Sequence, residues 1–161
     1  MRTLYTNIKA FIKQQLPQVV HVNIWNNQLA NLQDEPQFLR PAVFVEFGIV
    51  EWTKTNKSNK TGTIPVTLHI VNDCYDTDAD DIDMMNSLEL LNEVEEVFDG
   101  ATLQACTPFI NTSTQPDHDH GNLIENITTY TTEYTKCIRS NRKMTEVNAG
   151  LQVEGTIKKP L

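Results

Sequence analysis

PAVFVEFGIVEWT, residues Pro41–Thr53, and TIPVTLHIVNDCY, residues Thr63–Tyr75, are the stretches that decide the fold. Both are rich in β-branched and aromatic residues, which favour strands. In the second stretch Val66, Leu68 and Ile70 occupy alternate positions, so one face of the strand is apolar. We predict two central strands joined by KTNKSNKTG (residues 54–62), which is too long for a tight turn and is expected to be an extended hairpin loop.

Two amphipathic helices are predicted, one before and one after this pair of strands in the sequence. The first lies near the N-terminus, has apolar residues at helical spacing, and ends at Pro17; its apolar residues are Leu4, Ile8, Phe11 and Ile12. The second spans residues 84–100, MMNSLELLNEVEEVFDG, and ends at Gly100, where a left-handed residue commonly terminates a helix. Its expected apolar stripe is formed by Leu88, Leu91, Val94 and Phe98, widened by Leu90 and Val97.

The remaining segments complete a sheet. VVHVNIW (19–25) alternates and predicts a half-buried strand, followed by a polar connection over residues 26–41. ATLQACTPFIN (101–111) is a possible strand, STQPDHDHGN (113–122) a loop, and NLIENITTYTTEYTKC (122–137) a long strand. Strands in hairpins with helices between them indicate an α+β fold. We expect a mainly antiparallel sheet of four to five strands with two helices packed on one face, a long hairpin loop and an extended C-terminal arm. The predicted division is a single domain over residues 1–138 and an arm over 139–161.

Composition excludes several classes of protein. The net charge of −8 and the pI near 4.9 disfavour nucleic acid as the primary ligand, although residues 139–159 are locally basic. We expect no signal peptide and no membrane span. Cys74, Cys106 and Cys137 form no CxxC pair, so reduced thiols are expected and no disulfide or zinc framework.

The stretch YDTDADDID, Tyr75–Asp83, is the most acidic in the chain and invites a comparison with an EF-hand calcium loop. Asp76, Asp78 and Asp80 fit the first three ligand positions of that loop. Asp81 stands where the loop needs glycine, and Ser87 stands where it needs a bidentate glutamate. The favoured interpretation is an acidic lead-in to the second helix, with Asp83 or Asn86 as the capping residue.

Three histidines are further candidates for a metal site or a catalytic base. His118 and His120, beside Asp117 and Asp119, have the His-x-His spacing of a strand-edge metal site, but a solvated loop is favoured because no other ligand cluster is near. His69 could act as a base, yet a strand histidine between apolar neighbours more often has a packing or interface role. The chain has no GxSxG, HExxH, GxGxxG or P-loop motif. We therefore expect no enzyme, no cofactor and no metal; should a metal bind, the candidate ligands are Asp76, Asp78, Asp80, His118 and His120.

The order of motifs resembles the tail terminator, or tail completion, proteins of long-tailed phages and related minor tail proteins. An N-terminal amphipathic helix leads into VNIWNNQL, followed by PAVFVEFG. TGTIPVTLHIVNDCYDTD then runs from a strand into an acidic loop, SLELLNEVEEVFDG forms the helix, and TTYTTEY lies in the late strand. The resemblance covers about residues 1–137.

This resemblance implies a structural virion protein of the tail or neck, assembled in the host cytoplasm. Such proteins form a ring, commonly six-fold, that caps the tail tube, stops its polymerisation and docks to the head or neck. The implied partners are further copies of the chain, the tail tube protein and a neck or connector protein; genomic DNA would only pass through the lumen, and no membrane is involved. The implied alternative within the virion is a head–tail connector or neck ring protein.

Sheet edges and arms can pair across such a ring. The candidate interaction residues outside the acidic stretch are Trp25, Trp52, Lys54, Lys57 and Lys60. Those within the acidic stretch are Asp76, Asp78, Asp80 and Asp81, which are expected to face the lumen or a partner. The alternative from another class is a small metal- or ligand-binding module that uses residues 76–83 or 117–120.

Overall fold

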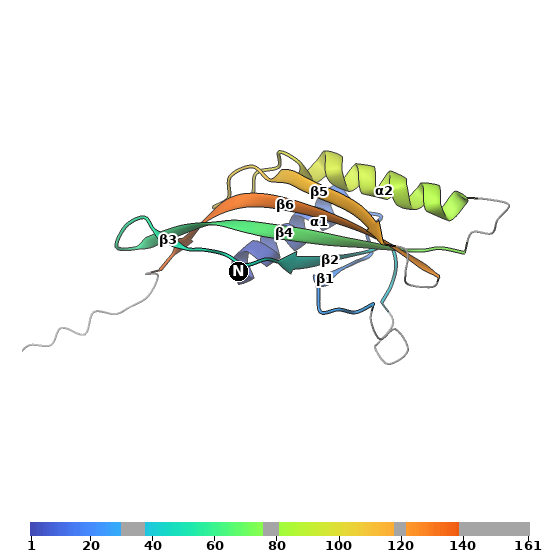
Figure 1. Ribbon diagram of the computed structural model, residues 1–161, viewed down its shortest axis with the longest axis horizontal. Coiled ribbons are helices and arrows are strands. Elements are labelled where there is room, and N and C mark those ends of the chain that lie inside the picture. The colour runs from blue at the N-terminus through green and yellow to red at the C-terminus, as the bar shows by residue number, and fades with distance from the viewer. Residues whose placement is uncertain (30–37, 76–80, 118–121, 139–161) are drawn as a thin grey trace, which may run out of the picture.

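The computed structural model describes residues 1–29, 38–75, 81–117 and 122–138. Two helices and six strands follow one another along the chain: α1 (Arg2–Gln15), β1 (His21–Ile24), β2 (Ala42–Phe47), β3 (Thr53–Lys54), β4 (Asn59–Asp73), α2 (Ile82–Phe98), β5 (Ile110–Asp117) and β6 (Leu123–Cys137). The architecture is α+β, as the sequence predicts (Figure 1).

The sheet has the order β1-β2-β4-β6-β5, with β3 paired to β4 outside this path. Only β1 and β2 run parallel; every other pair is antiparallel. The longest pairing joins β4 to β6 along the whole of both strands, from Asn59↔Cys137 to Asp73↔Leu123. These two strands form the spine of the molecule and extend together beyond the helices to the β3 end (Figure 1).

Both helices bury their apolar side chains against the same face of the sheet. Leu4, Ile8 and Ile12 of α1 are at most 1% exposed and share one core with Val94 and Phe98 of α2. The sheet supplies alternate residues of β4 to this core, because side chains two apart in a strand share a face; these are Ile64, Val66, Leu68 and Ile70. The prediction of two helices on one face is confirmed.

The ends of the helices follow from their residues. Leu16 closes α1 by donating its N–H to Ile12 O at 2.8 Å, and Pro17 cannot continue the helix. α2 ends at Phe98, and Gly100 has φ +76°, the left-handed conformation that glycine adopts without steric cost.

Three sequence predictions are corrected. The stretch 54–62 is not a long loop: Lys54 pairs with Lys60 and Thr53 with Thr61, leaving a turn over 55–58. In that turn Asn56 Oδ1 accepts the N–H groups of Ser58 and Asn59, both at 2.8 Å, and so stabilises a tight reversal that length alone would not predict.

The second correction concerns residues 101–117. The possible strand at 101–111 is mostly irregular, with one isolated bridge, Cys106↔Tyr134, and β5 begins only at Ile110 and continues to Asp117 within the expected loop. Polar residues fill this strand because it is the edge of the sheet, where burial is low.

The third correction concerns which side chains of α2 pack against the sheet. Leu88 is 40% exposed and does not face the sheet, whereas Leu90 and Leu91 are buried as predicted and the small Ser87 is buried as well. Ser87 can be buried because its hydroxyl is paired: the amide Nδ2 of Asn126 in β6 donates to Ser87 Oγ at 2.8 Å. In β1 only Val22 is buried, while Ile24 and the preceding residue Val20 are about half exposed.

Gly62 lies where residues 50–52 cross β4. A Cβ added there would stand 2.6 Å from Glu51 O and 2.9 Å from Val50 Cγ1. We expect Gly62→Ala to lower the free energy of unfolding by about 1–3 kcal/mol, since a backbone oxygen must move. Urea titration would measure this, with Thr63→Ala, at the exposed neighbouring position, as the control; equal midpoints for the two variants would contradict the prediction.

Candidate functional site

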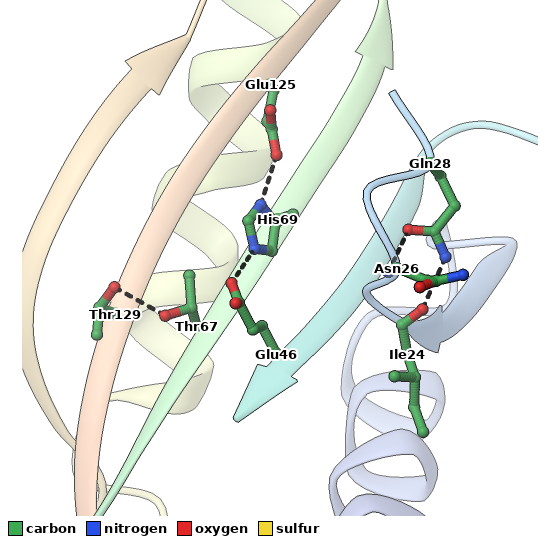
Figure 2. A network of polar contacts seen from close by, with 8 residues as sticks. All are labelled: Ile24, Asn26, Gln28, Glu46, Thr67, His69, Glu125 and Thr129. Atoms are coloured by element: carbon green, nitrogen blue, oxygen red, sulfur yellow. Dashed lines mark hydrogen bonds and ion pairs between the residues drawn. The ribbon is translucent and has the colours of Figure 1, made fainter. Parts of the chain in front are cut away.

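The sheet has a second face, opposite the helices, which we call the open face. Along β4 it carries the residues between the core positions, including Thr63, Pro65, Thr67 and His69. Thr67 lies opposite Thr129 of β6, and their hydroxyls are 3.1 Å apart (Figure 2). Among the described residues, this face is where titratable and hydroxyl side chains come together, and the strands of the sheet hold them in place.

His69 lies between two carboxylates on the open face. Its Nδ1 is 2.5 Å from Glu125 Oε1 of β6, and its Nε2 is 3.0 Å from Glu46 Oε2 of β2 (Figure 2). The side chains of His69 and Glu125 are 6% and 3% exposed, whereas that of Glu46 is 49% exposed. Each ring nitrogen of His69 therefore has a carboxylate oxygen within hydrogen-bonding distance.

Trp25 covers this histidine. The two rings are parallel within 5° and their centroids are 3.9 Å apart, and the backbone N–H of Trp25 donates to Val45 O at 3.0 Å. Stacked rings of this kind bury aromatic surface and fix the orientation of the imidazole. The stack therefore attaches the start of the 26–41 connection to the sheet.

The described ends of that connection pack on the open face. Leu29 is 4% exposed and belongs to a second apolar cluster with Ala42, Phe44, Val71 and Leu123, against which Trp25 and Phe38 also pack. Next to it, burial lowers the pKa of His21, and the positive charges of Lys9 and Lys13 lower it further. The polar connection thus contributes apolar anchors that cover part of the face.

These contacts limit what His69 can do chemically. A general base must reach the proton that it removes, but here both nitrogens are occupied and the ring is covered. The Glu46–His69–Glu125 cluster joins β2, β4 and β6 and is a structural tie. The packing interpretation of His69 fits this geometry, whereas its partners could not be chosen from the sequence.

The lysines of the hairpin gather at the far end of the spine. Lys54 and Lys57 are exposed, and Lys60 Nζ lies 4.2 Å from the ring centroid of Trp52, which in turn packs edge-on against Tyr134. Lys136 is paired with Lys60 across the sheet. We call Lys54, Lys57, Lys60 and Lys136 the lysine tip.

Of the acidic stretch, the structure describes Tyr75 and residues 81–83. Asp81 is the N-cap residue of α2 but its side chain makes no capping hydrogen bond, and Asp83 Oδ2 instead accepts the N–H of Tyr75 at 2.8 Å. Asp76, Asp78, Asp80, His118 and His120 lie outside the described residues. Within the described ranges there is no group of three His, Cys, Asp or Glu side chains placed to hold a metal ion, and no helix long and apolar enough to cross a membrane.

A cavity of about 300 Å³ lies between α2, the end of β4 and the segment before β2, and no sequence motif predicts it. We call it the acidic cavity; its walls include Arg40, Asn72, Asp73, Asp83, Glu89 and Glu93. Arg40 Nε is 2.5 Å from Asp73 Oδ1, and the Gln18 amide donates to Glu93. Residues more than seventy positions apart meet here, so no local motif could have revealed it.

Comparison with known proteins gives one informative result. No protein-family model matches the chain, and no curated protein sequence matches it. Among solved structures, the fold is similar to that of a chain in the virion of a native gene transfer agent (GTA) particle, with a TM-score of 0.51 and 10% sequence identity. The likeness covers 81% of this chain and 96% of that chain, and it concerns the fold.

Proposed function

We propose that this chain is a structural protein of a phage-like virion, and specifically a tail terminator that forms a ring at the end of the tail tube. The observation that carries the proposal is the shared fold with a chain of a gene transfer agent virion, which extends over nearly the whole of that chain. The order of motifs that resembles tail terminators supports the same role.

The shape of the protomer suits assembly. Strands β1 and β5 are the two edges of the sheet, and edges offer backbone groups to another chain. The β3–β4 hairpin projects beyond the helices and ends in exposed lysines (Figure 1). Arms and edges of this kind allow head-to-tail contacts, which close into a ring when the rotation per subunit fits.

The proposed partners are the tail tube protein on one side and a neck or connector protein on the other, with DNA passing through the lumen. Trp52 and the lysine tip are available for these contacts, and Asp81 lies on the exposed start of α2. Trp25 has a different role, since it packs on His69 within the protomer.

The test uses the tail tube protein of the particle that carries this chain. Polymerising tubes should stop growing when the purified chain is added, and electron microscopy should show a ring at one tube end. Tubes that grow equally long with and without the chain would overturn the terminator role. Binding to the neck protein but not to the tube would favour the connector alternative.

A further inference from the structure

Helix α2 carries apolar side chains on its solvent-facing side as well as on its buried side. Ile82, Met85 and Leu88 follow one another at intervals of three, so they form a row along the first half of the helix. Their exposed fractions are 63%, 56% and 40%. Tyr75, which is 64% exposed, adjoins this row because its N–H donates to Asp83 Oδ2 in the first turn of the helix. We call Tyr75, Ile82, Met85 and Leu88 the α2 patch.

The α2 patch stands out among the exposed apolar residues of the described chain. Ten large apolar side chains in the described ranges are at least 40% exposed, and four of them belong to this patch. Single exposed apolar residues are normal, whereas a group of neighbouring ones commonly marks a contact with another chain. Helix α2 lies at the periphery of the molecule, where another chain can reach it (Figure 1).

The second half of the same exposed side is acidic. Glu89 lies one turn beyond Met85, and Glu96 lies two turns beyond Glu89, so both continue the solvent-facing side of the helix. Neither glutamate forms an ion pair with any residue that the structure describes. The last turn of α2 has no basic residue, and carboxylates near a helix C-terminus are repelled by the negative end of the dipole. A partner that fits this side presents apolar side chains together with positive charges.

Residues 139–161 of the same chain have this composition. They include five basic and two acidic residues, whereas residues 1–138 include eight basic and nineteen acidic ones. The basic residues stand near both ends of the segment, and the apolar residues stand mostly between them; these apolar residues are Met144, Val147, Leu151, Val153, Ile157 and Leu161. A positive segment on an otherwise acidic chain has the charge that complements α2.

The described chain ends far from its own α2 patch. β6 ends at Cys137, which pairs with Asn59 at one end of β4, whereas α2 follows the other end of β4, at Asp73. At ~3.3 Å per residue, Asn59 and Asp73 are separated by about 46 Å. β6 therefore runs away from the patch of its own copy as it ends (Figure 1). A segment as long as residues 139–161 can span up to about 75 Å when extended, which is long enough to reach a neighbouring copy.

We propose that residues 139–161 of one copy dock on α2 of the next copy, with their apolar side chains on the α2 patch and their basic side chains beside Glu89 and Glu96. Each copy gives one segment and receives one, so the contact is head-to-tail, the kind that closes into a ring. The inference rests on the proposed function in that the receiving surface belongs to a second copy of the chain in a ring.

Charge exchange tests this contact by sedimentation velocity of the full chain at low ionic strength. R142E/K143E and E89K/E96K should each weaken self-association by about 10-fold or more, as expected when one side of a charged contact is reversed. An equimolar mixture of the two variants should associate again, since each segment then meets a helix of opposite charge on the other variant. R2E/K13E, with the same change in charge as R142E/K143E but on α1, should associate like the parent chain.

M85Q/L88Q tests the apolar half of the contact. Both side chains are exposed and glutamine favours a helix, so the urea midpoint should match that of the parent, whereas self-association should weaken by about 10-fold or more. A chain that stays monomeric at every concentration, a mixture of the charge variants that fails to associate, or M85Q/L88Q associating like the parent would overturn the docking proposal. Association that follows the charge exchange without any effect on tube length would instead overturn the terminator role alone.

Discussion

Phe98→Ala is expected to lower the free energy of unfolding by about 3–5 kcal/mol, the range found when a buried phenylalanine is truncated. Phe98 is 1% exposed and lies within 4.7 Å of Phe109 and 4.9 Å of Tyr130, measured between ring centroids. Phe11 of α1 meets it edge-on at 5.8 Å. One ring therefore joins both helices, the sheet and the segment before β5, and its loss leaves a cavity that these elements cannot all close.

Urea unfolding followed by circular dichroism would measure this loss. Leu88→Ala is the matched control, because it truncates a large apolar side chain on the exposed side of the same helix. Its expected cost is within about 0.5 kcal/mol. Similar midpoints for the two variants would mean that α2 does not pack through Phe98.

Glu125→Ala is the second large expected effect, a loss of about 3 kcal/mol of unfolding free energy. The substitution leaves the Nδ1 of His69 without its carboxylate in a site that is 6% exposed. It also breaks the tie between β4 and β6 next to the Trp25 stack. Glu133→Ala, on the same face of β6 but exposed, should change stability by no more than about 0.5 kcal/mol.

A double-mutant cycle separates the pair from the individual residues. If Glu125 acts through His69, Glu125→Ala and His69→Leu should be non-additive, with a coupling of about 0.5–3 kcal/mol. Strict additivity would show that the carboxylate stabilises the sheet through other contacts. The fluorescence of Trp25 offers a local readout, because Trp25 stacks on the same imidazole.

The helices, the central strands and the class of the fold could be predicted from the sequence because their signals are local. Apolar residues recur every two positions in the strands and every three to four in the helices, and Pro17 and Gly100 mark the helix ends. Each of these signals acts within one or two turns of chain. The same patterns did not predict β5, because this edge strand carries few apolar residues. They also did not predict the turn at residues 55–58, because it is stabilised by hydrogen bonds to the Asn56 side chain and not set by the length of the polar segment.

The pattern of residues along the chain is enough to show that alternate residues of β4 are apolar, that an amphipathic helix lies on each side of the hairpin in the sequence, and that acidic and basic residues occupy different segments. Which polar residues meet depends on the three-dimensional packing. Glu46, His69 and Glu125 come together through the register of three strands, and Asn72 meets Glu89 and Glu93 through the packing of α2. Register and packing depend on contacts between distant segments, and a shift of one residue in β2, β4 or β6 would turn that strand's member of the Glu46–His69–Glu125 cluster to the other face.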